Sequence, residues 1–231
     1  MKKDIIVIVP SRSNGSGREK NVERFIQHWM LFTEGHSDIC ISLDEDDEHY
    51  YDRYEGVIYT VNPNERLGPK MNTAASRFKD QYKCIAFFGD DHVIKTKWET
   101  EILEYFEDNG GVGIAYGNDL LQGERLPTAV CMTSNIINAL GYMIPKSLLH
   151  MYADNFWLDI GKATNNIKYF PNIIWEHMHP DIGKATRDAQ YSYAADVVHH
   201  DLNAYSLYIN DGSFINDINK INKIKNETSV I

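Results

Sequence analysis

The segment of residues 86–92 carries the clearest chemical signal in this sequence. It reads Ala-Phe-Phe-Gly-Asp-Asp-His, so an apolar run ends abruptly in the carboxylates of Asp90 and Asp91 and the imidazole of His92. Adjacent carboxylates repel each other unless a cation lies between them, and oxygen ligands suit Mg²⁺ or Mn²⁺. The segment therefore indicates a divalent-metal site. A solvated turn in which Asp91 caps a following helix is the alternative interpretation.

Polar side chains also follow two other apolar runs, at residues 5–9 and 39–43. The residues that come after these runs are Pro10, Ser11, Arg12 and Asp44. An arginine in such a turn can pair with phosphate, and a carboxylate can accept hydrogen bonds from a ribose or a base N–H. Three polar turns after three apolar runs make a stronger case for a binding site than any one of them.

The apolar runs alternate with segments that have apolar residues at helical spacing, as expected for buried strands joined by helices. In the first half, we expect strands at residues 5–9, 39–43, 57–61, 84–88 and 112–116, and helices at 22–29, 71–78 and 98–106. In the second half, we expect strands at 127–133, 167–170 and 173–175, and helices at 135–140, 154–164 and 189–207. This order predicts an α/β fold with a mainly parallel central sheet covered by helices on both faces.

Composition limits the class of protein. A chain of 231 residues can form a core without disulfides or a metal. Its 23 basic and 33 acidic residues give a formal charge of -10, which argues against attachment to nucleic acid or an anionic membrane through a general positive field but leaves room for a local basic groove. The three cysteines lie among apolar residues, as reduced core thiols do, and no apolar run is long enough to span a bilayer. These features predict a soluble, cytoplasmic protein.

Four motifs together resemble a family 2-type glycosyltransferase with the GT-A fold. They are Val-Pro-Ser-Arg at 9–12, the acidic turn at Asp44, Leu-Gly-Pro-Lys-Met-Asn at 67–72 and Phe-Gly-Asp-Asp-His at 88–92. In that family the first strand end, the Asp after the second strand and the Lys/Asn helix start surround the nucleotide. The resemblance therefore implies that the nucleotide is contacted by Pro10, Ser11, Arg12, Asp44, Lys70 and Asn72.

The acidic motif of the family, usually Asp-x-Asp, binds the ribose and a divalent metal that bridges the diphosphate. Here it reads Asp-Asp-His, so the resemblance implies Asp90 on the ribose or the metal, and Asp91 and His92 as metal ligands. By the same resemblance, Asp154 is the catalytic base of an inverting transfer, a role worth about 10²–10⁴ in rate. Asp154 as a simple N-cap of the following helix is the alternative.

Residues 176–180 read Glu-His-Met-His-Pro, and in an extended segment His177 and His179 point to the same side. GT-A enzymes often carry a C-terminal His as the last metal ligand, so the resemblance implies one of these two, with His179 slightly preferred. A structural or surface His pair is the alternative. Lys184 follows directly and is expected to neutralise a phosphate as a loop closes.

The resemblance implies a glycosyltransferase that uses Mn²⁺ or Mg²⁺ and a nucleotide-sugar donor, with a UDP-sugar as the expected donor. It extends over roughly residues 4–200 and includes similarity to small glycosyltransferase-like proteins of phages, which places such a protein in the host cytoplasm. The acceptor is either a hydroxymethylated pyrimidine in phage DNA or a carbohydrate, and the acidic balance favours the carbohydrate. A DNA acceptor requires stacking and phosphate contacts, for which the candidates are Trp157, Tyr191, Tyr193, Lys184 and Arg187.

Two other functions remain open at this point. A sugar-nucleotide nucleotidyltransferase shares the nucleotide-binding layout, but is expected to carry a Gly-rich loop directly after the first strand, whereas Gly15 and Gly17 come later. A non-catalytic nucleotide-binding module is the second. We expect one GT-A-like catalytic domain over residues 1–210 and a helical tail over 211–231, which frays before Ile231.

Overall fold

The computed structural model describes residues 3–228, including the side chains of residues 3–225. Over these residues a sheet of eight strands has the order β3-β2-β1-β4-β7-β6-β8-β5. The strands are β1 (Ile5–Pro10), β2 (Ser37–Asp44), β3 (Ile58–Asn62), β4 (Cys84–Phe87), β5 (His92–Ile94), β6 (Ile114–Asn118), β7 (Val130–Thr133) and β8 (Ile167–His177). The α-helices are α1 (Glu19–Phe32), α2 (Leu67–Phe78), α3 (Glu99–Asp108), α4 (Ser134–Leu140), α5 (Ala153–Ala163), α6 (Ala189–Ala195), α7 (Val198–Asn210) and α8 (Ser213–Thr228).

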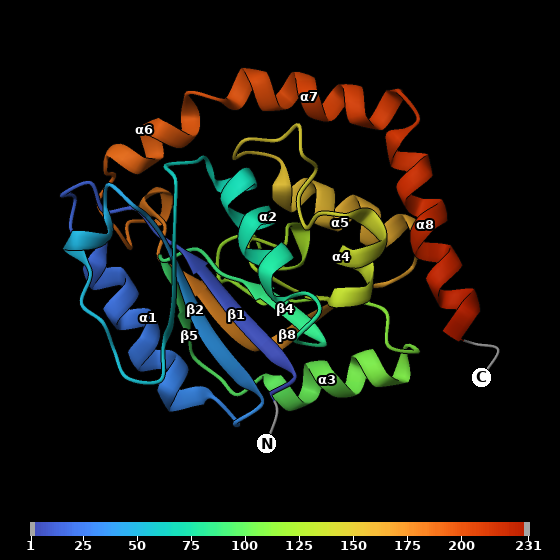
Figure 1. Ribbon diagram of the computed structural model, residues 1–231, viewed down its shortest axis with the longest axis horizontal. Helices are drawn as coiled ribbons and strands as arrows, with labels where there is room; N and C mark the ends of the chain where they lie inside the picture. The colour runs from blue at the N-terminus through green and yellow to red at the C-terminus, as the bar shows by residue number, and fades with distance from the viewer. Residues whose placement is uncertain (1–2, 229–231) are drawn as a thin grey trace.

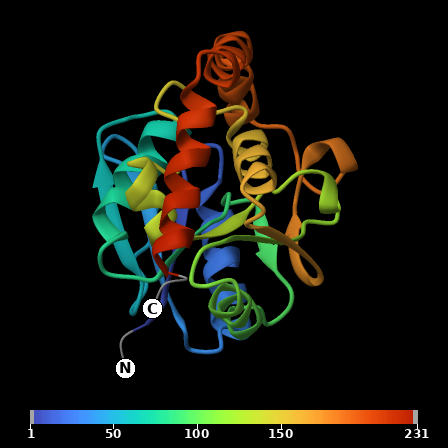
Figure 2. The ribbon, with the colours of Figure 1, turned by 90° about the vertical axis from the view of Figure 1, so that its right-hand side faces the viewer.

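The predicted α/β fold is confirmed, and the sheet is mixed. Strands β3, β2, β1 and β4 are parallel to one another, β7 is antiparallel to both β4 and β6, and β8 is parallel to β6 and antiparallel to β5. The antiparallel step arises because β6 is followed by β7 without the crossover helix that parallel neighbours need. All residues of β1 are buried, as expected of a strand covered on both faces. Helices α2 and α4 lie on the near face of the sheet in Figure 1, with α1 and α3 on the opposite side in Figure 2.

Two predicted boundaries in the second half are wrong. The two short strands predicted at residues 167–170 and 173–175 form one strand, β8, whose register with β6 shifts between Gly117 and Asn118. Pro171 has no N–H to donate to a ladder, so the chain bulges here instead of turning. The helix predicted over 189–207 is two helices, α6 and α7. Helix α6 lies over the carboxyl end of the sheet, and α7 continues along the upper edge of the molecule (Figure 1).

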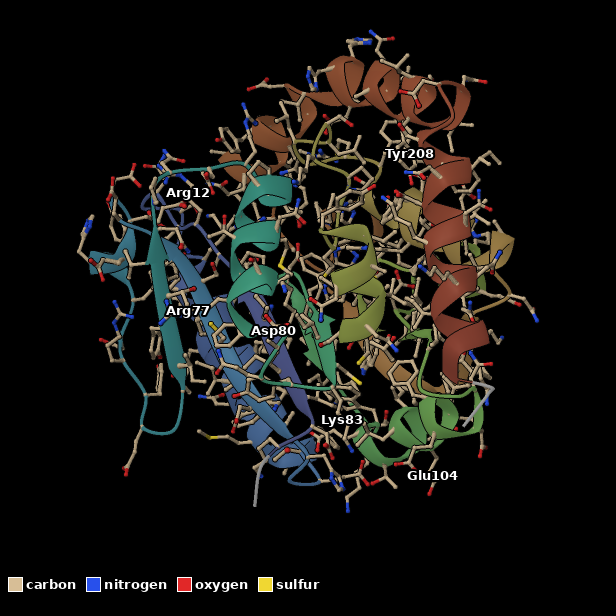
Figure 3. The ribbon with its side chains drawn as sticks, turned by 45° about the vertical axis from the view of Figure 1, so that its right-hand side comes forward. Arg12, Arg77, Asp80, Lys83, Glu104 and Tyr208 are labelled. Carbon is tan, nitrogen blue, oxygen red and sulfur yellow. The ribbon has the colours of Figure 1, made fainter. Side chains whose placement is uncertain are left out.

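The C-terminal helix α8 packs against α4, α5 and α7. Ile221 is fully buried, and the carboxylate of Asp217 accepts hydrogen bonds from Tyr142 and Tyr208 and pairs with Lys220 at 2.7 Å. Figure 3 shows Tyr208 at the corner where α7 meets α8. The predicted helix is therefore present, and the division at residues 210 and 211 stays a prediction. The predicted fraying before Ile231 lies outside the described residues. Within residues 3–228, no helix is both long enough and apolar enough to cross a bilayer.

Replacing Ile221 by alanine is expected to lower the free energy of unfolding by about 2–5 kcal/mol, because it leaves a cavity between α8 and its neighbours. Guanidinium unfolding followed by circular dichroism measures the change. Ile215→Ala is the matched control on the same helix: its side chain is 57% exposed, so we expect a change within about 0.5 kcal/mol. Small changes in both variants would contradict the packing of α8 into the domain.

Candidate active site

A cavity of about 560 Å³ lies at the carboxyl ends of β1 and β4, between the sheet edge, the start of α5 and the helix α6. Ligands of open α/β sheets bind at this end of the strands. Ten of the residues predicted to bind the nucleotide or the metal or to act as the base line it: Pro10, Ser11, Arg12, Lys70, Asp90, Asp91, His92, Asp154, His177 and His179. The chain thus brings together groups that lie up to about 170 positions apart.

Asp91, His92 and His177 form one cluster at the floor of this cavity. His92 in β5 pairs with His177 in β8 across the antiparallel ladder, and their rings stack with centroids 4.3 Å apart. One carboxylate oxygen of Asp91 lies 3.4 Å from His177 Nε2 and 3.6 Å from His92 Nδ1. Among the described residues, these three ligand atoms all lie within 4.8 Å of one another.

Two observations test whether this cluster fits a metal ion. His92 Nδ1 is buried and has no hydrogen-bond partner, which is costly unless a ligand fills the place. Gly89 lies beside it: a Cβ on this residue would come within 2.7 Å of Asp91 Oδ1 and 3.2 Å of His92 Nδ1, so the glycine keeps open the space on which both atoms converge. Ligands about 2.0–2.2 Å from one ion lie roughly 3–3.6 Å apart, and the two spacings from Asp91 Oδ1 to the histidine nitrogens, 3.4 and 3.6 Å, match. The cluster fits a divalent cation.

The protonation of the cluster follows from burial and charge. Burial alone would raise the pKa of Asp91, but the adjacent imidazoles, His177 first, outweigh it and hold that pKa well below its ordinary value. Burial and the charge of His177 lower the pKa of His92. Burial also opposes charge on His177, but Asp91 outweighs it and raises the pKa of this imidazole. Asp91 is therefore ionised and His92 neutral at pH 7.

Asp90 points away from this cluster toward Ser11 and Arg18. Ser11 Oγ donates to one of its oxygens at 2.5 Å, and Arg18 Nη1 lies 2.6 Å from the other. Burial raises the pKa of Asp90 to about 6, against the opposing charge of Arg18. Arg18 also pairs with Asp188, at the start of α6, at 2.8 Å. Sequence reasoning missed Arg18, although it is an arginine at the end of the loop that follows the first strand.

Asp44 is fully buried behind the cavity wall and does not line it. Its two oxygens are taken by Arg12 at 2.9 Å and Lys70 at 2.7 Å, and these two cations face the cavity. Arg12 lies at the upper end of the sheet in Figure 3 and also pairs with Asp46 at 2.7 Å. Asp44 therefore positions two cations. Glu65 also lines the cavity and has a buried oxygen without a hydrogen-bond partner.

The predicted motif at the start of α2 serves packing as well as the cavity. A Cβ on Gly68 would come within 2.2 Å of the carbonyl oxygen of Leu148, so only glycine allows this close approach. The side chain of Asn72 accepts hydrogen bonds from the backbone N–H groups of Met143 and Ile144 and donates to the carbonyl of Ile144, and it does not line the cavity. Lys70 is the charged residue of this motif that lines the cavity.

Asp154 lies in the first turn of α5, where its half-buried carboxylate lines the cavity. The N-cap position is held by Tyr152, so Asp154 is not the cap itself, and its carboxylate accepts only the backbone N–H of Asn155, at 2.9 Å, in the described structure. Burial raises its pKa above the ordinary value of an aspartate. Asp159, further along the same helix, accepts a hydrogen bond from Tyr205 at 2.6 Å and does not line the cavity.

Two predicted residues lie close to the cluster without joining it. His179 lines the cavity with its ring centroid 5.0 Å from that of His177, and its Nδ1 accepts the backbone N–H of Asp181 at 3.2 Å. Lys184 does not line the cavity, because its ammonium group pairs with Glu176 at 2.6 Å. The structure therefore brings His177, and not His179, against Asp91.

Other groups that were not predicted to contact the metal ligands surround the cluster; Tyr191 was predicted only as a stacking candidate for a DNA acceptor. Tyr191 in α6 donates to the second oxygen of Asp91 at 2.9 Å. Thr128 lies 3.3 Å from His92 Nε2 and donates to Asp119 at 2.8 Å. His150, before α5, lines the cavity, and burial lowers its pKa to about 4, so it is neutral. No local pattern in the sequence marks these residues, because each belongs to a loop or helix that the fold alone brings to the cavity.

Comparison with solved structures identifies the fold. Staphylococcus aureus TarS, residues 1–349, in complex with UDP-GlcNAc is 11% identical with a TM-score of 0.55, and the match covers 82% of this chain and 63% of that one. Rv0371C from Mycobacterium tuberculosis in complex with manganese is 10% identical with a TM-score of 0.51, covering 85% of this chain and all of that one. The mannosyltransferase PcManGT from Pyrobaculum calidifontis with GDP-Man and Mn²⁺ is 10% identical with a TM-score of 0.50, covering 96% of this chain and 74% of that one.

These similarities show a GT-A glycosyltransferase fold. The chain spans 36% of a longer TarS chain and 59% of the 1–349 fragment in complex with UDP. No protein-family model matches the sequence, and no curated protein matches it either.

Proposed function

We propose that this protein is a metal-dependent glycosyltransferase that moves a sugar from a nucleotide-sugar donor to an acceptor hydroxyl. The observation that carries the proposal is that one cavity is lined by three potential metal ligands, by basic side chains such as Arg12 and Lys70, and by the half-buried carboxylate of Asp154. Solved structures with the same fold were determined with nucleotide sugars and with Mn²⁺, which supports this assignment.

In the donor half of the site, Asp91, His92 and His177 would hold the metal, which would supply positive charge opposite the diphosphate leaving group. One carboxylate with two imidazoles suits Mn²⁺ better than Mg²⁺, which prefers oxygen ligands. Arg12 and Lys70, fixed by Asp44, add positive charge on the cavity wall and need not reorganise during the reaction. We expect a UDP-sugar donor.

The roles of the other residues on the donor side are inferred from their positions. Pro10 and Ser11 lie where the nucleotide is expected, beside Asp90, which we assign to the ribose. Lys184 meets a phosphate only if it exchanges its Glu176 partner on closure of the 176–188 segment. Asn72 does not reach the cavity, and its role is to fix the backbone at Met143 and Ile144 through hydrogen bonds.

In the acceptor half, Asp154 is the base. The acceptor oxygen attacks the anomeric carbon, the bond from that carbon to the diphosphate breaks, and the hydroxyl proton passes to the Asp154 carboxylate. This displacement inverts the configuration at the anomeric carbon. Because burial raises the pKa of Asp154, its ionised carboxylate is a stronger base than that of an exposed aspartate.

The environment of the cavity favours a carbohydrate acceptor over a flipped DNA base. Trp157 is 1% exposed and its indole donates to the carbonyl of Met143, so it is packed and not free to stack. Lys184 and Arg187 are already paired with Glu176 and Asp181, which leaves them engaged within the protein. The formal charge of -10 points the same way. A DNA acceptor would instead give binding that weakens steeply with salt.

Calorimetric titration with UDP, GDP and their sugars tests the proposal. With Mn²⁺ we expect one nucleoside diphosphate to bind at least tenfold more tightly than in EDTA, and its sugar to be slowly hydrolysed. The metal dependence follows because the diphosphate would otherwise face the ionised Asp91. Weak binding of every nucleotide, unchanged by Mn²⁺, would rule out the proposed function, and tight metal-independent binding without turnover would favour a binding module.

Asp154→Asn is expected to lower kcat by about 10²–10⁴ while leaving the KM for the donor nearly unchanged, because the amide cannot accept the proton. Asp159→Asn is the matched control on the same helix, and it should keep kcat within about threefold, since Asp159 bonds Tyr205 outside the cavity. Steady-state kinetics with the donor identified by calorimetry measures both.

The pH profile provides the second readout of the same variant. The ionised form of Asp154 is the active one, so the rate falls as the pH drops through its pKa, and because burial raises that pKa the fall comes at a higher pH than for an exposed aspartate. Asp154→Asn should remove this acid limb. An unchanged limb in the variant would assign the base to another group.

A further inference from the structure

We propose that Thr128 and Asp119 select the tautomer of His92 and so direct its Nδ1 lone pair at the metal position beside Asp91. The inference rests on the proposed metal-dependent function, but concerns two residues outside the three-residue cluster: Thr128, which lines the cavity, and Asp119, which does not. Both belong to the segment that leads from β6 to β7, next to the His92–His177 pair.

The carboxylate of Asp119 is surrounded by donors. Its Oδ1 accepts the backbone N–H groups of Leu121, Gln122 and Gly123 at 3.0, 2.7 and 2.8 Å, and the residue is 3% exposed. Its Oδ2 accepts the hydroxyl of Thr128 at 2.8 Å. An ionised carboxylate can only accept, so the single hydroxyl proton of Thr128 is committed to Asp119.

Because the Thr128 hydroxyl donates its proton to Asp119, it also fixes which ring nitrogen of His92 carries hydrogen. Thr128 Oγ1 also lies 3.3 Å from His92 Nε2, and since its own proton is used, it can only accept from the imidazole. In a neutral imidazole one nitrogen carries hydrogen and the other a lone pair. Nε2 must therefore be the protonated nitrogen, and Nδ1 carries the lone pair.

The lone pair is aimed at a place that already holds another acceptor. His92 Nδ1 is buried without a hydrogen-bond partner and lies 3.6 Å from Asp91 Oδ1. Two acceptors that face each other in a buried site repel unless a cation lies between them. The Thr128–Asp119 pair thus converts His92 from a group that can donate to Asp91 into a ligand that shares a cation with it.

Asp119 also fixes the third member of the cluster. Its backbone carbonyl accepts the N–H of His177 at 2.9 Å, at the point where β8 ends. Asp119 therefore acts on His92 indirectly, through the hydroxyl of Thr128, and on His177 directly, through a backbone hydrogen bond. Groups that orient metal-binding histidines in this way typically contribute 10–100-fold to metal affinity.

The first measurement is the tautomer itself, on the metal-free full-length chain with ¹⁵N-labelled histidine. Long-range ¹H–¹⁵N NMR spectra distinguish the protonated from the unprotonated ring nitrogen, and His92→Gln assigns the signals. We expect the Nε2–H form for His92 in the wild type and loss of this preference in Thr128→Val. A wild-type His92 that carries its proton on Nδ1 would overturn the proposal, whatever the variants do.

The second measurement is Mn²⁺ affinity without nucleotide, from the electron paramagnetic resonance signal of the free ion. Thr128→Val is expected to weaken binding about 10–100-fold, whereas Thr128→Ser, which keeps the hydroxyl, should stay within about threefold of the wild type. Thr60→Val is the control for the substitution, because Thr60 is buried in β3 away from the cavity. Thermal unfolding checks that all variants are folded.

The outcomes separate this inference from the proposed function. If the wild type binds no Mn²⁺, the metal-dependent function fails, and this inference fails with it. If the wild type binds Mn²⁺ and folded Thr128→Val binds it equally well, the metal site stands and the role of Thr128 and Asp119 is refuted. Loss of affinity in Thr128→Val together with its recovery in Thr128→Ser supports the role, because a purely steric effect would not be restored by the hydroxyl.

Discussion

Burial of three carboxylates at the carboxyl ends of β2 and β4, on either side of β1, is the constraint on which the rest of the site depends. Asp44, Asp90 and Asp91 are 0%, 2% and 9% exposed. A buried charge is costly unless it is paired and hydrogen-bonded. Arg12 and Lys70 compensate Asp44, and Arg18 with Ser11 compensates Asp90. Asp91 has imidazoles and a tyrosine hydroxyl instead of a permanent cation, so a divalent ion bound beside it would complete the charge balance.

The surrounding elements can be understood from this requirement. Glycine at position 68 lets α2 approach the 148–149 backbone, and this docking holds Lys70 against Asp44. Helix α6 closes the cavity from the opposite side, where Tyr191 reaches Asp91 and Asp188 reaches Arg18. Arg12 and Lys70, which balance Asp44, and the cluster around Asp91 line the cavity in which a diphosphate would bind. In this protein, stabilisation of the folded strand ends and preparation for an anionic ligand are two aspects of one charge arrangement.

How much the sequence predicts depends on whether a feature is local. The strand that ends in Asp90, Asp91 and His92 was predictable because the apolar run and the acidic turn are contiguous, and the α/β order follows from periodicity. In α2, residues 70 and 72 lie about 200° apart around the helix, so only one of them can face the cavity, and it is Lys70. His177 and His179 share a side only while the chain is extended, but β8 ends at His177. Arg18, Asp119, Thr128 and Tyr191 reach the site through tertiary contacts that no sequence period encodes.

Crystals of the protein soaked with Mn²⁺ and measured at the manganese absorption edge test the central claim most directly. We expect one strong anomalous peak within bonding distance of Asp91 Oδ1, His92 Nδ1 and His177 Nε2, in the space that Gly89 leaves open. Binding of Mn²⁺ at Asp90, or at His179 without His177, or no peak in the cavity at all, would contradict it.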